Sequence, residues 1–200
     1  MNHRNSQKRL EVDEGIFSIT VNTKDRYPYF QEEVFCDLFI EELRLCKQMR
    51  KFRLYGFSLM HDHFHMLIHP DEGENISRVM HYLKRNTSRD INSIIEGEDN
   101  DPRLHNLKSQ FLPLFEVLKN HKQSLNELKH KFHKKYPTQH PFPHFSWQSS
   151  FHDHLIRNER DLQNQLNYIW WNPEKHGLTT DAMKYPYSSF GFHRDLIDLF

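Results

Sequence analysis

The spacing of apolar residues divides the first half of the chain into segments of different predicted structure. Residues 15–21 alternate between apolar and polar positions, which is typical of a strand. Residues 31–52 carry apolar side chains at every third or fourth position and predict an amphipathic helix that packs on a sheet. Residues 54–69 are rich in β-compatible and aromatic side chains and stop at Pro70. We expect a single long strand there.

Capping residues predict two further helices. Asn75 can cap a helix with a continuous apolar stripe, formed by Ile76, Val79, Met80, Leu83, Thr87, Ile91 and Ile94. Asn158 can cap another helix. Because Pro173 disfavours helical geometry at the residue before it, Asn172, we expect this helix to end near Trp171.

The segment between these helices has no sustained hydrophobic pattern. Residues 97–145 contain a basic stretch and several prolines, and we interpret them as an insertion with a helix around 118–132. Residues 145–151 predict another strand. The alternation of strands and helices predicts an α+β sandwich with a mainly antiparallel sheet. At 200 residues, the chain is expected to form a single domain, 1–200.

Composition narrows the class of protein. No apolar run approaches the roughly 20 residues needed to span a bilayer, and Met1–Leu10 is too polar for a secretory signal, so we expect a cytoplasmic protein without a membrane partner. Cys36 and Cys46 lie ten residues apart on a predicted helix, about 15 Å, which excludes a disulfide between them. Lys plus Arg and Asp plus Glu number 27 each, which argues against coating of duplex DNA by bulk charge. The 16 histidines direct attention to metal binding.

The strongest local signal is a histidine pair in the segment 60–68, Met-His-Asp-His-Phe-His-Met-Leu-Ile. On a strand, His63 and His65 point to the same face and can present two imidazoles to one ion, while Phe64 and Met66 enter the core. The alternative is that these histidines only form a solvated sheet surface, because short motifs often match by chance.

A second signal lies in the segment 166–178. Tyr168 and Asn172 are four residues apart and share one face of a helix. A tyrosine can attack a phosphodiester and form a covalent intermediate if a metal, a base or a cation assists it. The amide oxygen of Asn172 is a suitable third ligand beside two histidines. Alternatively, Tyr168 is a core aromatic and Asn172 caps a short helix that starts at Pro173 and ends at Gly177.

Together, the two segments resemble the single-tyrosine HUH transposases of the insertion-sequence-200 type, and most closely the REP-associated tyrosine transposases. The resemblance rests on His63-Phe64-His65 and on the later tyrosine helix that ends in Asn172-Pro173. Two further stretches, 76–94 and 147–157, are also similar. The sequence departs from the pattern at His61, where the motif often has proline, and in the long insertion.

This resemblance implies a ferredoxin-like fold and site-specific nicking of single-stranded DNA at hairpin-marked ends. It implies that His63, His65 and Asn172 hold a divalent metal ion, Mg²⁺ or Mn²⁺, and that Tyr168 is the nucleophile that takes the 5′ phosphate. Relatives of this kind act as monomers or homodimers. The candidate phosphate contacts, for which a solvated helix face is the alternative, are Lys84, Arg85, Arg89, Arg157 and Lys175.

Three other functions remain open from the sequence. A metal-dependent nuclease that activates water would retain the histidines but would not need Tyr168. A domesticated DNA-hairpin-binding protein would keep the fold without cleavage. A structural metal protein would unfold when the metal is removed.

Overall fold

The computed structural model describes residues 15–97 and 112–199, and a four-stranded antiparallel sheet lies at its centre. The strands follow the order β2-β3-β1-β4 across the sheet. Their bounds are Phe17–Asn22 for β1, Phe52–Leu59 for β2, His63–Pro70 for β3 and His152–Leu155 for β4. Both neighbours of β1 run antiparallel to it, as does β2 to β3.

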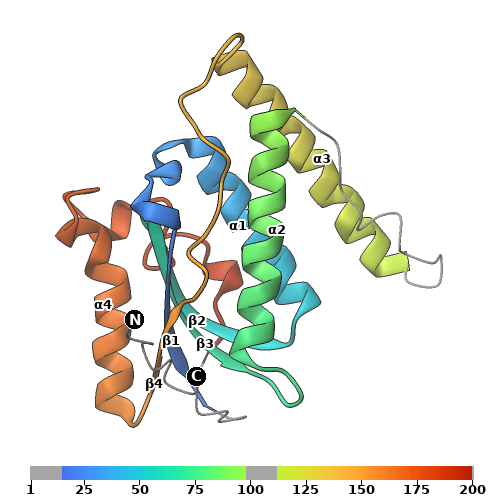
Figure 1. Cartoon of the computed structure of the whole chain (residues 1–200). Helices are drawn as coiled ribbons and strands as arrows, with labels where there is room; N and C mark the ends of the chain where they lie inside the picture. Colours follow the sequence, from blue (N-terminus) through green and yellow to red (C-terminus); the bar gives the residue numbers. More distant parts are fainter. Residues whose placement is uncertain (1–14, 98–111, 200) are drawn as a thin grey trace, which may run out of the picture.

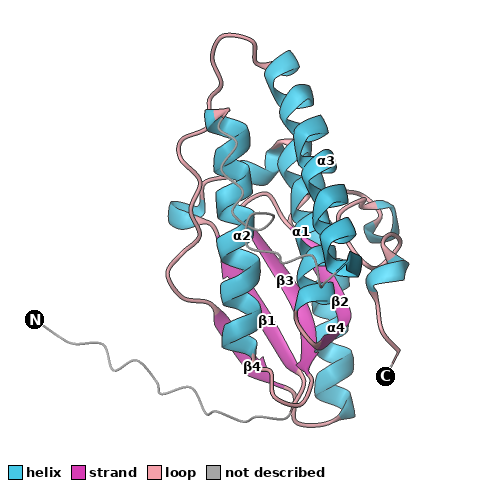
Figure 2. Cartoon of the chain, turned by 90° about the vertical axis from the view of Figure 1, so that its right-hand side faces the viewer, coloured by secondary structure: helices cyan, strands magenta, loops and turns pink. Residues whose placement is uncertain are grey.

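Helices cover both faces of this sheet (Figure 1). The α-helices are α1 (Glu33–Met49), α2 (Ile76–Glu96), α3 (Leu112–Lys135) and α4 (Glu159–Lys175). Short 3-10 turns span Lys24–Arg26, Tyr29–Gln31, Ala182–Lys184 and Arg194–Leu196. α1 and α2 lie on one face, α4 lies on the other, and α3 stands outside α1 and α2 (Figures 1 and 2).

The order β1-α1-β2-β3-α2-β4 is that of a ferredoxin-like sandwich, with α3 inserted before β4 and α4 added after it. The predicted α+β class with a mainly antiparallel sheet is therefore confirmed. Asn75 and Asn158 cap α2 and α4 as predicted, since their side chains accept hydrogen bonds from the backbone N–H groups of Arg78 and Asp161. Of the described helices, none is long and apolar enough to cross a membrane.

Two hydrophobic clusters hold the layers together. The larger cluster joins the sheet to α1, α2 and α3 and includes the buried thiols Cys36 and Cys46, which are not disulfide-bonded. The smaller cluster fixes α4 to the opposite face through Leu166 and Ile169. Gly56 allows close approach there, because a Cβ at this position would lie 3.1 Å from Leu166 Cδ2. The position of α4 over β2 and β3 is thus set by packing.

The prediction of one long strand over 54–69 is wrong. β2 and β3 form a hairpin, and the chain turns between Leu59 and His63, where Met60 N–H donates to His63 C=O at 2.7 Å. The turn contains neither glycine nor proline, so nothing in the local sequence interrupted the strand-like pattern.

The strand predicted for 145–151 is also misplaced. Within this stretch only Trp147 pairs, in an isolated bridge to Thr23, and β4 begins at His152. The predicted insertion 97–145 lies partly outside the described residues, which omit 98–111, and its helix is longer than expected.

The prediction that α4 ends near Trp171 is wrong, because the helix continues through Pro173 to Lys175. Pro173 lies in the last turn of α4, where its missing N–H removes one helical hydrogen bond and only Glu174 and Lys175 follow it in the helix. The last turn is closed by His176 N–H, which donates to Asn172 C=O at 3.0 Å, and Gly177 follows with a positive φ of 70°.

Candidate active site

β3 presents His63 and His65 side by side on the face of the sheet that α4 covers. Their ring centroids are 4.9 Å apart, and both residues are at least 95% buried. Asp62 Oδ1 lies 2.5 Å from His63 Nδ1, and Thr20 Oγ1 lies 2.7 Å from His65 Nδ1. Because a second group holds each Nδ1, the rings are oriented and each Nε2 is left for another ligand.

Burial keeps both histidines in the neutral form that binds metals. It lowers the pKa of His63, although the hydrogen bond to Asp62 partly opposes this effect. Burial, followed by the charge of His63, lowers the pKa of His65 to about 3. Neutral imidazole is the ligating form, so neither ring has to lose a proton at neutral pH before it can coordinate an ion.

α4 places Tyr168 directly beside this pair. The Tyr168 ring centroid is 5.1 Å from that of His65, and the tyrosine is 44% exposed, so its phenol is accessible to a large substrate. Lys175 Nζ lies 5.6 Å from the centroid of the same ring. The alternative that Tyr168 is a core aromatic does not agree with this exposure.

Asn172 lies one helical turn after Tyr168 and is only 1% exposed. Neither its Oδ1 nor its Nδ2 has a hydrogen-bond partner among the described residues, and the same is true of His65 Nε2. Buried polar atoms without partners are rare, because each costs roughly 1–3 kcal/mol. Two imidazoles and an amide oxygen therefore fit a divalent cation, which would supply the missing interactions.

The predicted DNA contacts fall in two places. Lys175, the last residue of α4, lies beside the Tyr168 ring, whereas the exposed Arg157 precedes the Asn158 cap at the other end of this helix. Lys84, Arg85 and Arg89 lie on α2, which packs on the opposite face of the sheet. The structure therefore does not bring these three cations to the tyrosine.

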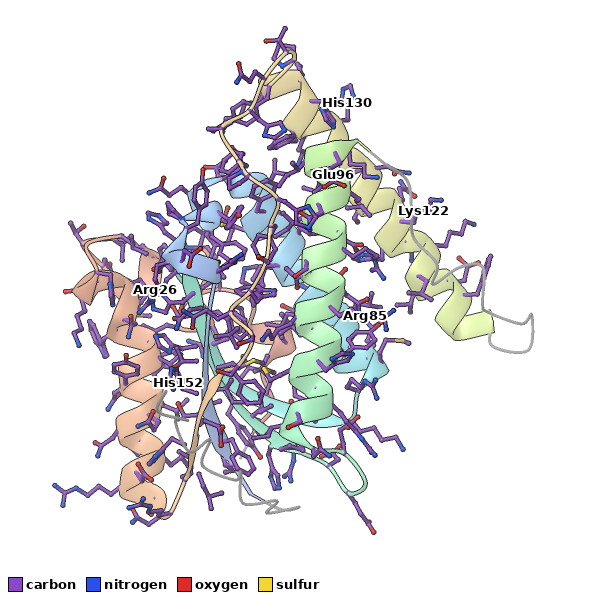
Figure 3. The ribbon with its side chains drawn as sticks, in the orientation of Figure 1. Arg26, Arg85, Glu96, Lys122, His130 and His152 are labelled. Atoms are coloured by element: carbon purple, nitrogen blue, oxygen red, sulfur yellow. The ribbon has the colours of Figure 1, made fainter. Side chains whose placement is uncertain are left out.

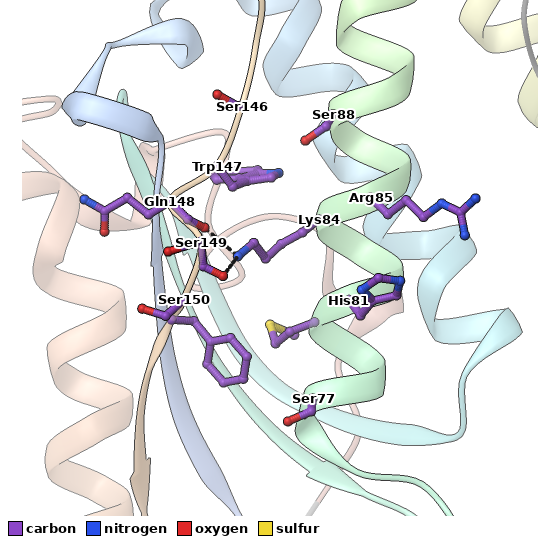
Figure 4. A pocket seen from close by; sticks show the side chains of 12 residues that line it. Ser77, His81, Lys84, Arg85, Ser88, Ser146, Trp147, Gln148, Ser149 and Ser150 are labelled. Atoms are coloured by element: carbon purple, nitrogen blue, oxygen red, sulfur yellow. Dashed lines mark hydrogen bonds between the residues drawn. The ribbon is translucent and has the colours of Figure 1, made fainter. Parts of the chain in front are cut away.

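The cations of α2 differ in their surroundings. Lys84 Nζ donates to the backbone carbonyls of Gln148 and Ser149, at 2.7 and 3.3 Å, across a cavity of about 550 Å³ between α2 and the segment 146–151 (Figure 4). Arg89 Nε donates to Asp90 at 2.7 Å. Arg85 is exposed and extends away from the segment 146–151 (Figures 3 and 4).

Sequence reasoning missed three residues that shape the site. His176 follows Asn172 by four residues, and its ring centroid is 5.5 Å from that of His63. That spacing was the signal that could have identified it. Thr20 and Asp62 could not be found from the sequence, because Thr20 reaches His65 only through the pairing of β1 with β3.

A further group of possible metal ligands lies outside this site. Glu42, Asp90 and His121 are buried, and one donor atom from each lies within 4.8 Å of the others, a set that could hold a metal ion. These residues belong to α1, α2 and α3, so they lie on the other side of the sheet from Tyr168.

Parts of this chain are similar in sequence to known transposases. Residues 12–106 match the model of the family described as Transposase IS200 like. A 50-residue segment is 52% identical to a protein of Haemophilus influenzae named as a REP-associated tyrosine transposase, and a segment of equal length is 42% identical to the REP-associated tyrosine transposase of Escherichia coli K12. Each match covers 25% of this chain and less than a third, 27% and 29%, of the relative's own length.

The fold is shared with a solved structure of a REP-associated tyrosine transposase bound to a REP hairpin. The TM-score is 0.53 at 19% sequence identity, and the alignment covers 98% of this chain and 85% of the other. Residues 12–106 are thus similar to the IS200-like transposase family, and shorter segments are similar to REP-associated tyrosine transposases. The family match contains His63 and His65 and ends before α4, so Tyr168 and Asn172 lie beyond it.

Proposed function

We propose that this protein is a transposase that cleaves and rejoins single-stranded DNA through a covalent bond between Tyr168 and a 5′ phosphate. The observation that carries the proposal is the convergence of an exposed tyrosine with two oriented histidines and a buried, unpartnered Asn172 amide. A purely structural site gives no reason to bury an unsatisfied amide beside a solvent-accessible phenol.

The proposed reaction is a transesterification at phosphorus. The Tyr168 oxygen forms a bond to the scissile phosphorus, the bond to the 3′ oxygen of the preceding nucleotide breaks, and that oxygen leaves as a 3′ hydroxyl. The phenol loses one proton and the leaving oxygen gains one, so the step is balanced. Lys175, whose Nζ lies 5.6 Å from the centroid of the tyrosine ring, attracts the phosphate. The reverse attack by a 3′ hydroxyl rejoins DNA without another energy source.

His63, His65 and Asn172 would hold the divalent ion, for which we propose Mg²⁺ or Mn²⁺. When bound, such an ion polarises the scissile phosphate and offsets the charge that develops on it. Three protein ligands leave other coordination positions for phosphate oxygens. Asp62 and Thr20 keep the imidazoles in position before DNA arrives.

We further propose that the DNA substrate contains a hairpin, since the solved relative is bound to one. Lys175 would contact the strand at the tyrosine, and Arg157 would contact it near the start of α4. Among the three candidates on α2, Arg85 is the exposed one and would contact DNA that extends to the other face, whereas Lys84 and Arg89 already make internal contacts.

The test is a cleavage assay on single-stranded hairpin oligonucleotides taken from around the gene, with Mg²⁺ or Mn²⁺. Tyr168→Phe should abolish cleavage, and His63→Ala with His65→Ala should abolish it as well. Cleavage that persists in Tyr168→Phe would indicate a nuclease that activates water. Tight binding without cleavage by the wild type at all metal concentrations would indicate a hairpin-binding protein.

A further inference from the structure

Three helices that are far apart in the sequence each bring one metal-ligating atom to the same buried point. Glu42 comes from α1, Asp90 from α2 and His121 from α3, and their exposed fractions are 0%, 1% and 5%. His121 Nε2 lies 2.9 Å from Glu42 Oε1 and 3.0 Å from Asp90 Oδ2. The convergence couples α3 to the two helices that cover the sheet.

We propose that Glu42, Asp90 and His121 bind a divalent transition-metal ion that fastens α3 to α1 and α2. One imidazole nitrogen with two carboxylate oxygens suits Zn²⁺ or Mn²⁺ better than Mg²⁺, which prefers oxygen alone. With metal–ligand bonds of about 2.0–2.1 Å, ligands of a tetrahedral ion lie roughly 3.4 Å apart. The two distances from His121 Nε2 to the carboxylate oxygens, 2.9 and 3.0 Å, therefore need to lengthen by only a few tenths of an ångström to accept one.

The charges around this point also favour a cation. Burial raises the pKa of Glu42 to about 7, which reflects the cost of keeping its carboxylate charged in the interior. Arg89 Nε donates to Asp90 Oδ1 at 2.7 Å, which offsets one carboxylate and leaves Oδ2 directed at His121. A metal ion at this point would favour the charged form of the Glu42 carboxylate.

A proton on His121 satisfies the geometry of this cluster less well than a metal ion does. A single Nε2–H can point at only one of the two carboxylate oxygens, although both lie at nearly the same distance. A metal ion among the three donor atoms bonds to all of them at once. The Arg89 contact corresponds to the outer-shell hydrogen bonds that usually orient carboxylate ligands.

His121 also lies at the edge of a cavity. The cavity has a volume of about 190 Å³ between α1 and α3 and is lined by His121, Gln48, Asn120 and Ser124, whereas Glu42 and Asp90 do not line it. Leu125, on the same helix, packs into the main core, so the ion would fix a helix that is already partly anchored.

The experiment measures Zn²⁺ binding in a His63→Ala/His65→Ala chain, so that the candidate active site does not contribute. Calorimetry with ZnCl₂ and elemental analysis after dialysis should give one tightly bound ion per chain. Asp90→Asn and Glu42→Gln, which preserve shape, should each weaken binding beyond the roughly 10–100-fold expected for an outer-shell partner. His130→Ala, which removes an exposed histidine of the same helix (Figure 3), should leave binding unchanged.

A second measurement needs no change in the cluster itself. In the His63→Ala/His65→Ala chain, Zn²⁺ should slow amide hydrogen exchange along α3. The proposal is overturned if that chain binds neither Zn²⁺ nor Mn²⁺, which would make the cluster a proton-bridged ion network only. It is also overturned if Asp90→Asn and Glu42→Gln bind Zn²⁺ as tightly as their parent, or if exchange on α3 does not respond to Zn²⁺.

Discussion

Replacement of Asn172 by leucine should stabilise the metal-free protein and abolish DNA cleavage. The Asn172 side chain is 1% exposed, and neither of its polar atoms has a partner among the described residues. Each such atom costs roughly 1–3 kcal/mol, and leucine has a similar branched shape without polar atoms. We expect the free energy of unfolding to rise by about 1–3 kcal/mol, since the fit of the two added methyl groups will not be perfect. For a chain of this size, the corresponding rise in Tm is roughly 2–10 °C.

Asn92 provides the matched control. It is also buried, but its Nδ2 donates to Phe145 C=O at 3.0 Å and its Oδ1 accepts from Phe145 N–H at 2.7 Å. Asn92→Leu should therefore lower the free energy of unfolding by about 2–4 kcal/mol, because two buried backbone groups lose their partners.

The assay is urea denaturation of both variants and the wild type in EDTA, with cleavage measured separately in Mn²⁺. Opposite signs for the two asparagines are expected. A loss of more than about 1 kcal/mol in Asn172→Leu would refute the reasoning, since it would mean that the Asn172 amide stabilises the fold as a cap or hydrogen-bonding partner.

Three further results are expected. In EDTA, lowering the pH from 7 to 5 should reduce the free energy of unfolding by about 2 kcal/mol more in the wild type than in His65→Leu, because the unfolded chain protonates His65 below about pH 6.5 while the folded chain keeps it neutral; an equal pH dependence of both chains in urea denaturation would contradict the assignment. Gly191→Ala should cost about 1–3 kcal/mol in the same assay, because the new Cβ would lie 1.9 Å from the Met183 carbonyl oxygen; wild-type stability would contradict this contact. Leu166→Ala should lower the free energy of unfolding by about 2–5 kcal/mol and reduce cleavage, because Leu166 packs α4 onto the sheet. Asn167→Ala, which changes an exposed neighbour, should change neither quantity.

Most of the fold follows from local signals in the sequence. The apolar spacing identified α1 and α2, and the side chains of Asn75 and Asn158 marked where α2 and α4 begin. The turn after Leu59 escaped notice because it contains neither glycine nor proline, and α4 passes Pro173 although this proline removes one hydrogen bond from its last turn. The sequence was therefore sufficient to predict a helix boundary where a single capping residue determines the local backbone conformation.

The relative positions of site residues were predictable where both residues lie on the same strand or helix. The pair His63 and His65 follows from the two-residue period of a strand, and Tyr168 with Asn172 follows from the period of a helix. That α4 faces the histidine pair could not be derived from either period, because it depends on how Leu166 packs across the sheet. For the same reason, the partners of His121 could be seen only in the three-dimensional structure.

The central claim, that Tyr168 becomes covalently bound to DNA, is tested most directly by mapping the adduct. A 3′-labelled single-stranded hairpin oligonucleotide would be incubated with the protein and Mn²⁺, denatured, digested with nuclease and protease, and analysed by mass spectrometry. Tyr168→Phe and Tyr187→Phe, which alters a tyrosine packed against the main core, would be compared with the wild type. The account predicts a phosphonucleotide on Tyr168 in the wild type and in Tyr187→Phe, and no adduct in Tyr168→Phe. An adduct on another residue, or cleavage that leaves a free 5′ phosphate and no adduct, would contradict it.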